Sequence, residues 1–162
     1  MLQALQLFKS YPLPGFYFQV TMGLEMWSFQ EVSGLNTEVE VLNYRHGKSK
    51  QLGNYKMPGR PSTTDAVLKK GMFRGDTFLF EWFQGNLTEL VRKDVTICLL
   101  NEYHIPEIIW ILSNAFPVKI ESSTLNSTDS AVAVESVTLS YDELQIENSI
   151  SMVGKALGKA IL

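Results

Sequence analysis

The first half of the chain alternates apolar and polar residues in short runs that are typical of β-strands. The run from Phe16 to Met22 is aromatic and β-branched, and glycine and proline bound it. Between Leu35 and Tyr44 the apolar residues alternate with glutamates, which predicts a strand with one buried and one solvated face. Further short strands are predicted at residues 26–29, 55–58 and 62–70.

One stretch near the middle of the chain has a helical period instead. Large apolar residues between Phe78 and Phe83 fall at helical spacing, and Asp76 precedes them as an expected N-cap. The pair Gly85-Asn86 predicts the end of this helix. Because the helix is short and amphipathic, we expect it to pack on the outside of a sheet.

The second half returns to strands, predicted at residues 94–100, 107–112, 118–123 and 131–141. A change of phase near Glu135 predicts a β-bulge in the last of them. Many short strands, frequent turn signals and one helix together predict a mainly β fold, a barrel or sandwich with one flanking α-helix. The 162 residues suffice for one such domain, which we assign to residues 1–147.

Residues 148–162 form a segment of different character. Its apolar residues recur at a spacing of three and four, at Ile150, Val153, Leu157 and Ile161. Two glycines weaken a free helix, and a helix this short is marginal in water. We therefore predict a C-terminal helical extension that docks on a partner, with a frayed terminus as the alternative.

Charge is distributed unevenly along the chain, whose formal net charge is −3. Residues 1–75 hold nine lysines and arginines against five acids, and the remainder holds five against twelve. Opposite charge on two parts of one subunit favours self-association, whereas a merely solvated loop is the plain alternative. The residues predicted to contact neighbouring subunits or rings are Arg45, His46, Lys48, Lys50, Asn54, Lys56 and Arg60. An acidic total without a recognition motif disfavours specific nucleic-acid binding.

Motifs for catalysis are missing from the sequence. The two histidines have no second metal-ligand type at ligand spacing, and phosphate-binding loops and nucleophile elbows are absent. Cys98 lies in an apolar run and is interpreted as a buried structural thiol. We therefore predict a protein that is not an enzyme and has no cofactor. Without an export signal or a run of about 20 apolar residues, it is expected to be made in the cytoplasm without inserting into membranes.

An ordered series of short motifs between residues 11 and 147 adds a family resemblance. The series is Tyr11-Pro12-Leu13-Pro14, Phe16–Val20, Val32-Ser33-Gly34-Leu35, Glu38-Val39-Glu40, Tyr44-Arg45, Lys56-Met57-Pro58-Gly59, Leu68-Lys69-Lys70-Gly71, Gly75-Asp76, Trp82, Arg92-Lys93-Asp94, Trp110, Asn114-Ala115-Phe116-Pro117 and Ala133–Leu139. In this order the motifs resemble the tail-tube proteins of contractile phages and of the related extracellular contractile injection systems.

This resemblance implies both an architecture and partners. In that family, six copies close into a ring with a continuous inner β-barrel, and rings stack into a hollow tube inside a contractile sheath. The region matching residues 42–59 is implied to contact neighbouring subunits and the next ring. Ring closure also removes exposed sheet edges. The implied partners are further copies, stacked rings, the sheath and the spike or baseplate, in a phage tail or an extracellular particle through which cargo passes.

Three alternatives accompany this interpretation. Tube subunits of the family typically end soon after the position of Glu147, whereas this chain has about fifteen further residues. The first alternative to an ordinary tube subunit is therefore a subunit of the tube-initiator ring on the spike. A secreted ring protein that carries effectors, as in type VI secretion, is the second alternative. A β-barrel carrier of small ligands is the third, and the long basic loop disfavours it.

Overall fold

The computed structural model describes residues 12–48, 50 and 52–149. In chain order the elements are β1 (Phe18–Met22), β2 (Glu25–Trp27), β3 (Glu31–Ser33), β4 (Thr37–Tyr44), β5 (Tyr55–Thr63), β6 (Ala66–Gly71), α2 (Phe78–Thr88), β7 (Lys93–Leu100), β8 (Pro106–Ser122), β9 (Val134–Ser140) and β10 (Glu143–Asn148). The prediction of a mainly β fold with a flanking helix is thereby confirmed.

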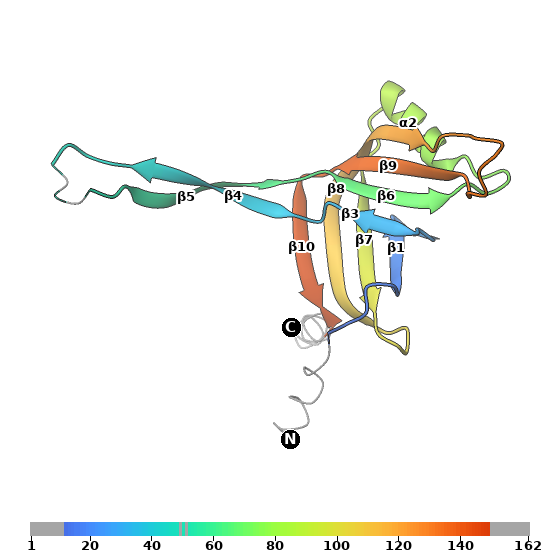
Figure 1. Ribbon diagram of the computed structural model, residues 1–162, viewed down its shortest axis with the longest axis horizontal. Helices are drawn as coiled ribbons and strands as arrows, with labels where there is room; N and C mark the ends of the chain where they lie inside the picture. Colours follow the sequence, from blue (N-terminus) through green and yellow to red (C-terminus); the bar gives the residue numbers. More distant parts are fainter. Residues whose placement is uncertain (1–11, 49, 51, 150–162) are drawn as a thin grey trace, which may run out of the picture.

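Eight of the strands form one antiparallel sheet that folds over on itself. Its order is β2-β1-β7-β8-β9-β6-β3, and β10 pairs with the first half of β8. Figure 1 shows that β1, β7, β10 and the first half of β8 run across the direction of β3, β6 and β9. The long strand β8 belongs to both halves, and the fold resembles an open barrel. We call this part of the molecule, with α2, the body.

The core lies between the two halves of the folded sheet. In β6 and β9, buried residues alternate with partly exposed ones, so each strand turns one face inward. The pairing register places Leu68 opposite Val137 and Val20 opposite Ile97, which brings inward side chains together. The buried cluster comprises Val20, Met22, Ala66, Leu68, Leu79, Trp82, Val95, Ile97, Leu112, Ala115, Val137, Leu139 and Tyr141.

Helix α2 covers one end of this core. Its N-cap is Thr77, one residue after the expected Asp76. The Asp76 carboxylate still accepts the backbone N–H of Phe78 at 3.3 Å, which satisfies one of the free donors of the first turn. Leu79 and Trp82, three positions apart, point into the core and are buried. The expected packing of an amphipathic helix on the outside of the sheet is thus what the structure shows.

The predicted end of the helix at Gly85 is wrong, because α2 continues to Thr88. The side chain of Asn86 accounts for the difference. It donates to the carbonyl of Trp82 at 2.8 Å and accepts the N–H of Val91 at 2.7 Å. The side chain that predicted a break therefore ties the last turn to the segment that leads into β7.

The two strands predicted at 107–112 and 118–123 are one continuous strand, β8. The polar and proline residues between them bend the strand rather than end it. Asn114 adopts a positive φ of 54°, and its N–H donates to Asp94 at 3.0 Å. Pairing with β9 slips between Pro117 and Lys119, so the bulge accommodates the proline.

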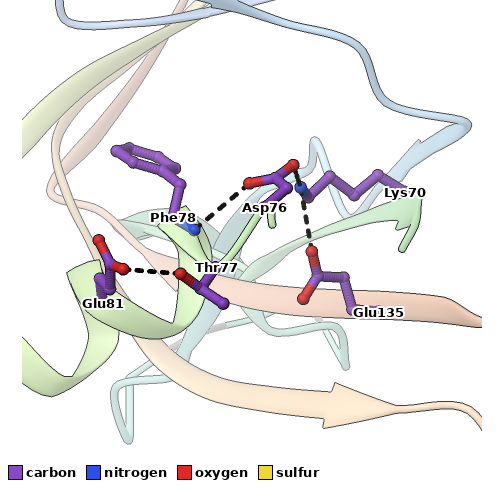
Figure 2. A network of polar contacts seen from close by, with 6 residues as sticks. All are labelled: Lys70, Asp76, Thr77, Phe78, Glu81 and Glu135. Carbon is purple, nitrogen blue, oxygen red and sulfur yellow. Dashed lines mark hydrogen bonds and ion pairs between the residues drawn. The ribbon is translucent and has the colours of Figure 1, made fainter. Parts of the chain in front are cut away.

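A buried ion cluster joins β6, β9 and the loop before α2. Figure 2 shows the ammonium of Lys70 between the carboxylates of Asp76 and Glu135, and its Nζ lies 3.0 Å from Glu135 Oε1. The same nitrogen lies 5.3 Å from the centre of the Trp27 ring. Desolvation alone lowers the pKa of Lys70, but its two carboxylate partners outweigh that effect and leave the pKa raised. The hydrogen bond from Lys70 lowers the pKa of Asp76.

The bulge predicted near Glu135 is wrong, and the ion cluster explains why. Strand β9 pairs with β6 without interruption from residue 134 to residue 139, and Lys70 lies directly opposite Glu135. Glu135 shares the inward phase of Val137 because it pairs with the buried Lys70. A charged residue on the buried face looked like a change of phase in the sequence.

Candidate functional site: an exposed hairpin arm

Strands β4 and β5 and the turn between them form a hairpin, residues 37–63, which we call the arm. Figure 1 shows it projecting far from the body along the longest axis of the molecule. In the described chain the two strands pair only with each other. All eight residues of β4 and seven of the nine in β5 are exposed. The prediction of a half-buried strand over residues 35–44 is therefore wrong, because no part of the body covers either face.

The arm has an irregularity that bends it. Its register slips between Val39 and Val41, where the facing strand carries two prolines that cannot donate to the ladder. A Cβ on Gly59 would lie 2.9 Å from the carbonyl oxygen of Glu40, so the close approach of the two backbones requires glycine there. The hairpin is built for a twisted path rather than for continuation of the main sheet.

The base of the arm is fastened to the body. Gly34 has a φ of 80°, and a Cβ there would lie 2.2 Å from the carbonyl oxygen of Asp65. Thr64 donates its hydroxyl to the Gly34 carbonyl at 3.0 Å and its N–H to the Asn36 carbonyl at 3.3 Å. These contacts join the two segments of the chain that connect the arm to the body. The direction of the arm is therefore set at its root.

Apolar side chains cover much of the arm. On the two strands the largest are 47–56% exposed, and Leu52 in the segment between them is 94% exposed; those on the strands are Val39, Val41, Leu42, Tyr44, Tyr55 and Met57. Complete burial of such a side chain contributes roughly 1.5–3 kcal/mol, so covering the exposed half contributes roughly 1 kcal/mol each. A hairpin of two strands is marginal on its own in water, and contiguous exposed apolar surface marks an interaction site. The arm is therefore expected to order fully against another chain.

The residues singled out from the sequence lie on the outer part of this arm, except Arg60, which lies nearer its root beside the Val39–Pro61 pair. Arg45, His46, Lys48, Lys50 and Asn54 belong to the segment between the strands, and Lys56 and Arg60 lie on β5; all are exposed. Five positive charges and no acid fall between residues 41 and 64. None of the ion pairs found among the described residues involves a lysine or arginine of the arm.

The sequence reasoning missed the apolar half of the site. Tyr44 and Tyr55 face each other across the hairpin, and the His46 ring lies 6.3 Å and 6.0 Å from theirs. Asn43 and Lys56 form the next pair toward the body, and Leu42 and Met57 form the pair after it. The signal was present, because apolar residues occupy matching positions on both sides of the basic turn. It was assigned to a buried face instead of a binding surface.

Other candidate chemistry is sparse in the part of the chain that the structure describes. Residues 12–48, 50 and 52–149 contain no group of three or more His, Cys, Asp and Glu side chains that could hold a metal ion. Cys98, predicted to be buried, is only partly buried, and this burial raises the pKa of its thiol, which keeps it protonated at neutral pH. Over the same residues, the structure has no helix of the length and apolarity that crossing a membrane requires. The predicted docking residues Ile150, Val153, Leu157 and Ile161 lie outside the described residues.

Solved structures contain close relatives of this fold. A chain in the PVC sheath-tube complex of an extracellular contractile injection system, in its extended state, is 35% identical, with a TM-score of 0.80 and coverage of 88% of this chain and 96% of that one. A chain in the anti-feeding prophage cap, described as a tube terminating cap, is 33% identical, with a TM-score of 0.80 and coverage of 86% and 93%. Hcp1 from Flavobacterium johnsoniae is 15% identical at a TM-score of 0.53, covers 83% and 97%, and shares the fold alone.

The comparison of sequences agrees with these structures. No curated protein sequence matches the chain significantly. The family described as T4-like virus tail tube protein gp19 matches residues 14–145, which include the whole arm and nearly all of the body. The resemblance carried by the ordered motifs is thereby confirmed, and the chain belongs to the T4-like virus tail tube protein gp19 family.

Proposed function

We propose that this chain is a structural subunit of the inner tube of a contractile injection system. Its copies close into a ring, a hexamer as the family resemblance implies, and the rings stack around a lumen through which cargo passes. Family membership and the relatives in a sheath-tube complex and a tube cap support this role. The observation that carries it is the arm, an apolar and basic hairpin that residues 12–48, 50 and 52–149 of its own subunit leave exposed.

The role is one of assembly rather than catalysis. The arm supplies a mixed surface, in which apolar side chains contribute binding free energy and charges contribute orientation and rate of encounter. The body supplies a rigid wall, because its strands pair around one core and the base of the arm is fixed to it. A subunit of this kind is suited to contacts that repeat around a ring.

A version without the arm tests this role. Thr37 and Thr63 face each other in the hairpin, so Asn-Gly can join them as a tight turn while β3 and β6 stay intact. Size-exclusion chromatography with light scattering, together with negative-stain microscopy, would show whether each protein assembles. We expect rings or tubes from the complete chain and folded monomers from the armless one. Tubes formed by the armless protein, or a complete chain that stays near 18.3 kDa at every concentration, would overturn the proposal.

The terminal segment gives the proposal a second part. We propose that the extension predicted over residues 148–162 docks on a neighbouring ring or on the spike, as an initiator ring would require. Strand β10 ends at Asn148, so removing 149–162 leaves the sheet complete. The truncated protein should keep its melting temperature but lose co-purification with the spike or incorporation into particles. A truncated protein that unfolds would show that the segment belongs to the core of the subunit.

A further inference from the structure

The arm needs a receiving surface, and the structure offers one at the other end of the molecule. We propose that α2 and the two loops beside it, residues 71–77 and 123–133, receive the arm of a second copy. We call this surface the receiving end. The inference rests on the proposed function, since it names the partner surface of the same arm.

The receiving end is a defined part of the body. Figure 1 shows α2 and both loops on the side opposite to the arm. The two loops are joined by a hydrogen bond from the N–H of Met72 to the carbonyl of Ala133, at 2.9 Å. Below them, Lys70 holds Asp76, and Asp76 in turn holds the first turn of α2, as Figure 2 shows. The surface is therefore preorganised, which lowers the entropic cost of binding.

Apolar side chains are exposed across the receiving end. They are 48–81% exposed, and they come from the helix and from both loops: Phe73 67%, Phe80 48%, Leu87 73%, Leu125 81% and Val132 76%. Phe80 and Leu87 are seven positions apart, so they lie on one face of α2, away from the buried Leu79 and Trp82. The 123–133 loop also lines a hollow of about 570 Å³. These features match the apolar pairs of the arm in chemistry and fit the expectation that a binding surface is apolar at its centre.

Charge is complementary between the two surfaces. The receiving end carries exposed acids: Glu81 on α2, Glu89 just after the helix and Asp129 in the 123–133 loop. Its one exposed positive charge is Arg74. The arm carries five positive charges against two acids, Glu38 and Glu40, and both acids lie near its root. Two arms that met each other would bring like charges together, which costs free energy. A contact of arm with receiving end brings opposite charges together instead.

The placement of the two surfaces fits a ring. Two different surfaces on roughly opposite sides of one subunit make a head-to-tail contact, and such contacts close into rings when the rotation permits. Each copy then gives one arm and receives one arm. Every exposed arm in a closed ring is covered, and so is every receiving end.

A charge-swap experiment tests the contact. One variant reverses the arm (Arg45→Glu, Lys48→Glu and Lys56→Glu), a second reverses the receiving end (Glu81→Lys and Glu89→Lys), and a third combines both sets. We expect each single set to lower the assembled fraction at least tenfold in sedimentation velocity at about 0.1 M salt, where exposed charges are screened over about 10 Å. The combined variant should recover most of the assembly. The matched control joins the reversed arm to Glu102→Lys and Glu143→Lys, which add the same charge elsewhere and should restore nothing.

The outcomes separate this inference from the proposed function. If the reversed arm abolishes assembly while the reversed receiving end leaves it unchanged, the arm acts as proposed but the receiving end is overturned. If the reversed arm assembles normally, the role of its charges in the proposed function fails. Circular dichroism on each variant keeps a folding defect from being read as lost assembly.

Disulfide trapping gives an independent readout. In a Cys98→Ala background, one protein carries Tyr55→Cys on the arm and another carries Leu87→Cys on α2. Under a mild oxidant the mixture should yield covalent dimers, whereas neither protein alone should do so. Phe73→Cys and Leu125→Cys in place of Leu87→Cys extend the test over the surface. Failure of all three pairs to crosslink in assembled material would overturn the inference.

Discussion

The arm and the body are built from the same kind of strand, yet they differ in what covers them. In β6 and β9 each inward side chain meets a partner across the core, and residues such as Leu68 and Leu139 are completely buried. In β4 and β5 the alternation is interrupted at the adjacent Val41 and Leu42, and about half of each apolar side chain stays in solvent. The body thus packs its apolar side chains within one subunit, whereas the proposed function has the arm stabilised by assembly.

Two adjacent lysines show the same contrast on the scale of one residue. The side chain of Lys70 is 2% exposed and lies between two carboxylates, whereas that of Lys69 is 42% exposed and pairs with Glu31 on the surface. A buried ion pair is costly to break because the remaining charges lose their partner. An exposed pair contributes little, because water and salt compete with it. The side of the strand on which each lysine lies, rather than its residue type, therefore sets how much its ion pair contributes to the free energy of unfolding.

The largest expected effect is at this pair. Lys70→Met removes the ammonium and leaves Asp76 and Glu135 facing each other, so we expect the free energy of unfolding to fall by about 3–5 kcal/mol. Lys69→Met is the matched control, with an expected loss below about 1 kcal/mol. Urea denaturation followed by tryptophan fluorescence measures both. Equal losses for the two variants would contradict the contrast.

A second substitution compares the core with the arm. Leu112 is completely buried, so Leu112→Ala should lower the free energy of unfolding by about 2–5 kcal/mol. Val41→Ala on the arm should change it by less than about 0.5 kcal/mol in the isolated subunit, since half of that side chain is already in solvent. The arm variant should instead raise the concentration at which rings form. A large loss of monomer stability on Val41→Ala would mean that the arm packs on its own body.

The root of the arm should show an intermediate effect. A methyl group on Gly34 would meet the Asp65 carbonyl in a backbone conformation that only glycine adopts readily, so Gly34→Ala should cost about 1–3 kcal/mol. Gly47 near the tip has open space around it, and Gly47→Ala should be neutral within about 0.5 kcal/mol. Thermal unfolding of the isolated subunits compares them. A neutral Gly34→Ala would show that the base is not held as described.

The pH dependence of stability should be the smallest of these effects. Because the pKa of Asp76 is lowered on folding, its contribution is present above the ordinary pKa of about 3.9 and is lost as pH falls through the folded value. The raised pKa of Lys70 preserves its contribution until pH rises through a value above about 10.4. The difference in stability between the natural protein and Asp76→Asn should therefore be constant at neutral pH and shrink in acid. A difference that grows in acid has the wrong sign for this account.

The sequence predicted the class of fold and most strands, because burial alternates with period two throughout β6 and β9, although it does not in β7 and β8. It failed where one residue serves two purposes. Asn86 signals a turn yet ties the end of α2, and Glu135 signals a surface yet pairs with a buried lysine. Short β10 passed unnoticed, since six residues with two glutamates carry little periodicity.

The charge of residues 45–60 located the candidate site in the sequence, but the burial of its first strand was predicted wrongly. Alternation along residues 37–44 indicates that the two faces of the strand differ. It does not indicate whether another part of the protein covers the more apolar face. The basic turn located the arm correctly, and the paired tyrosines and Leu42–Met57 became visible as a binding surface only with the register in hand. Cover by a second chain is a property of the assembly, which no local pattern records.

Hydrogen–deuterium exchange on the free and the assembled protein tests the central claim, that the arm is stabilised by a neighbouring copy. In the free subunit, amides of residues 37–63 should exchange at least tenfold faster than those of β6 and β9, because an isolated hairpin opens easily. In assembled rings or tubes, the same arm amides should become as protected as the core. An arm that exchanges equally fast in both states would contradict the account.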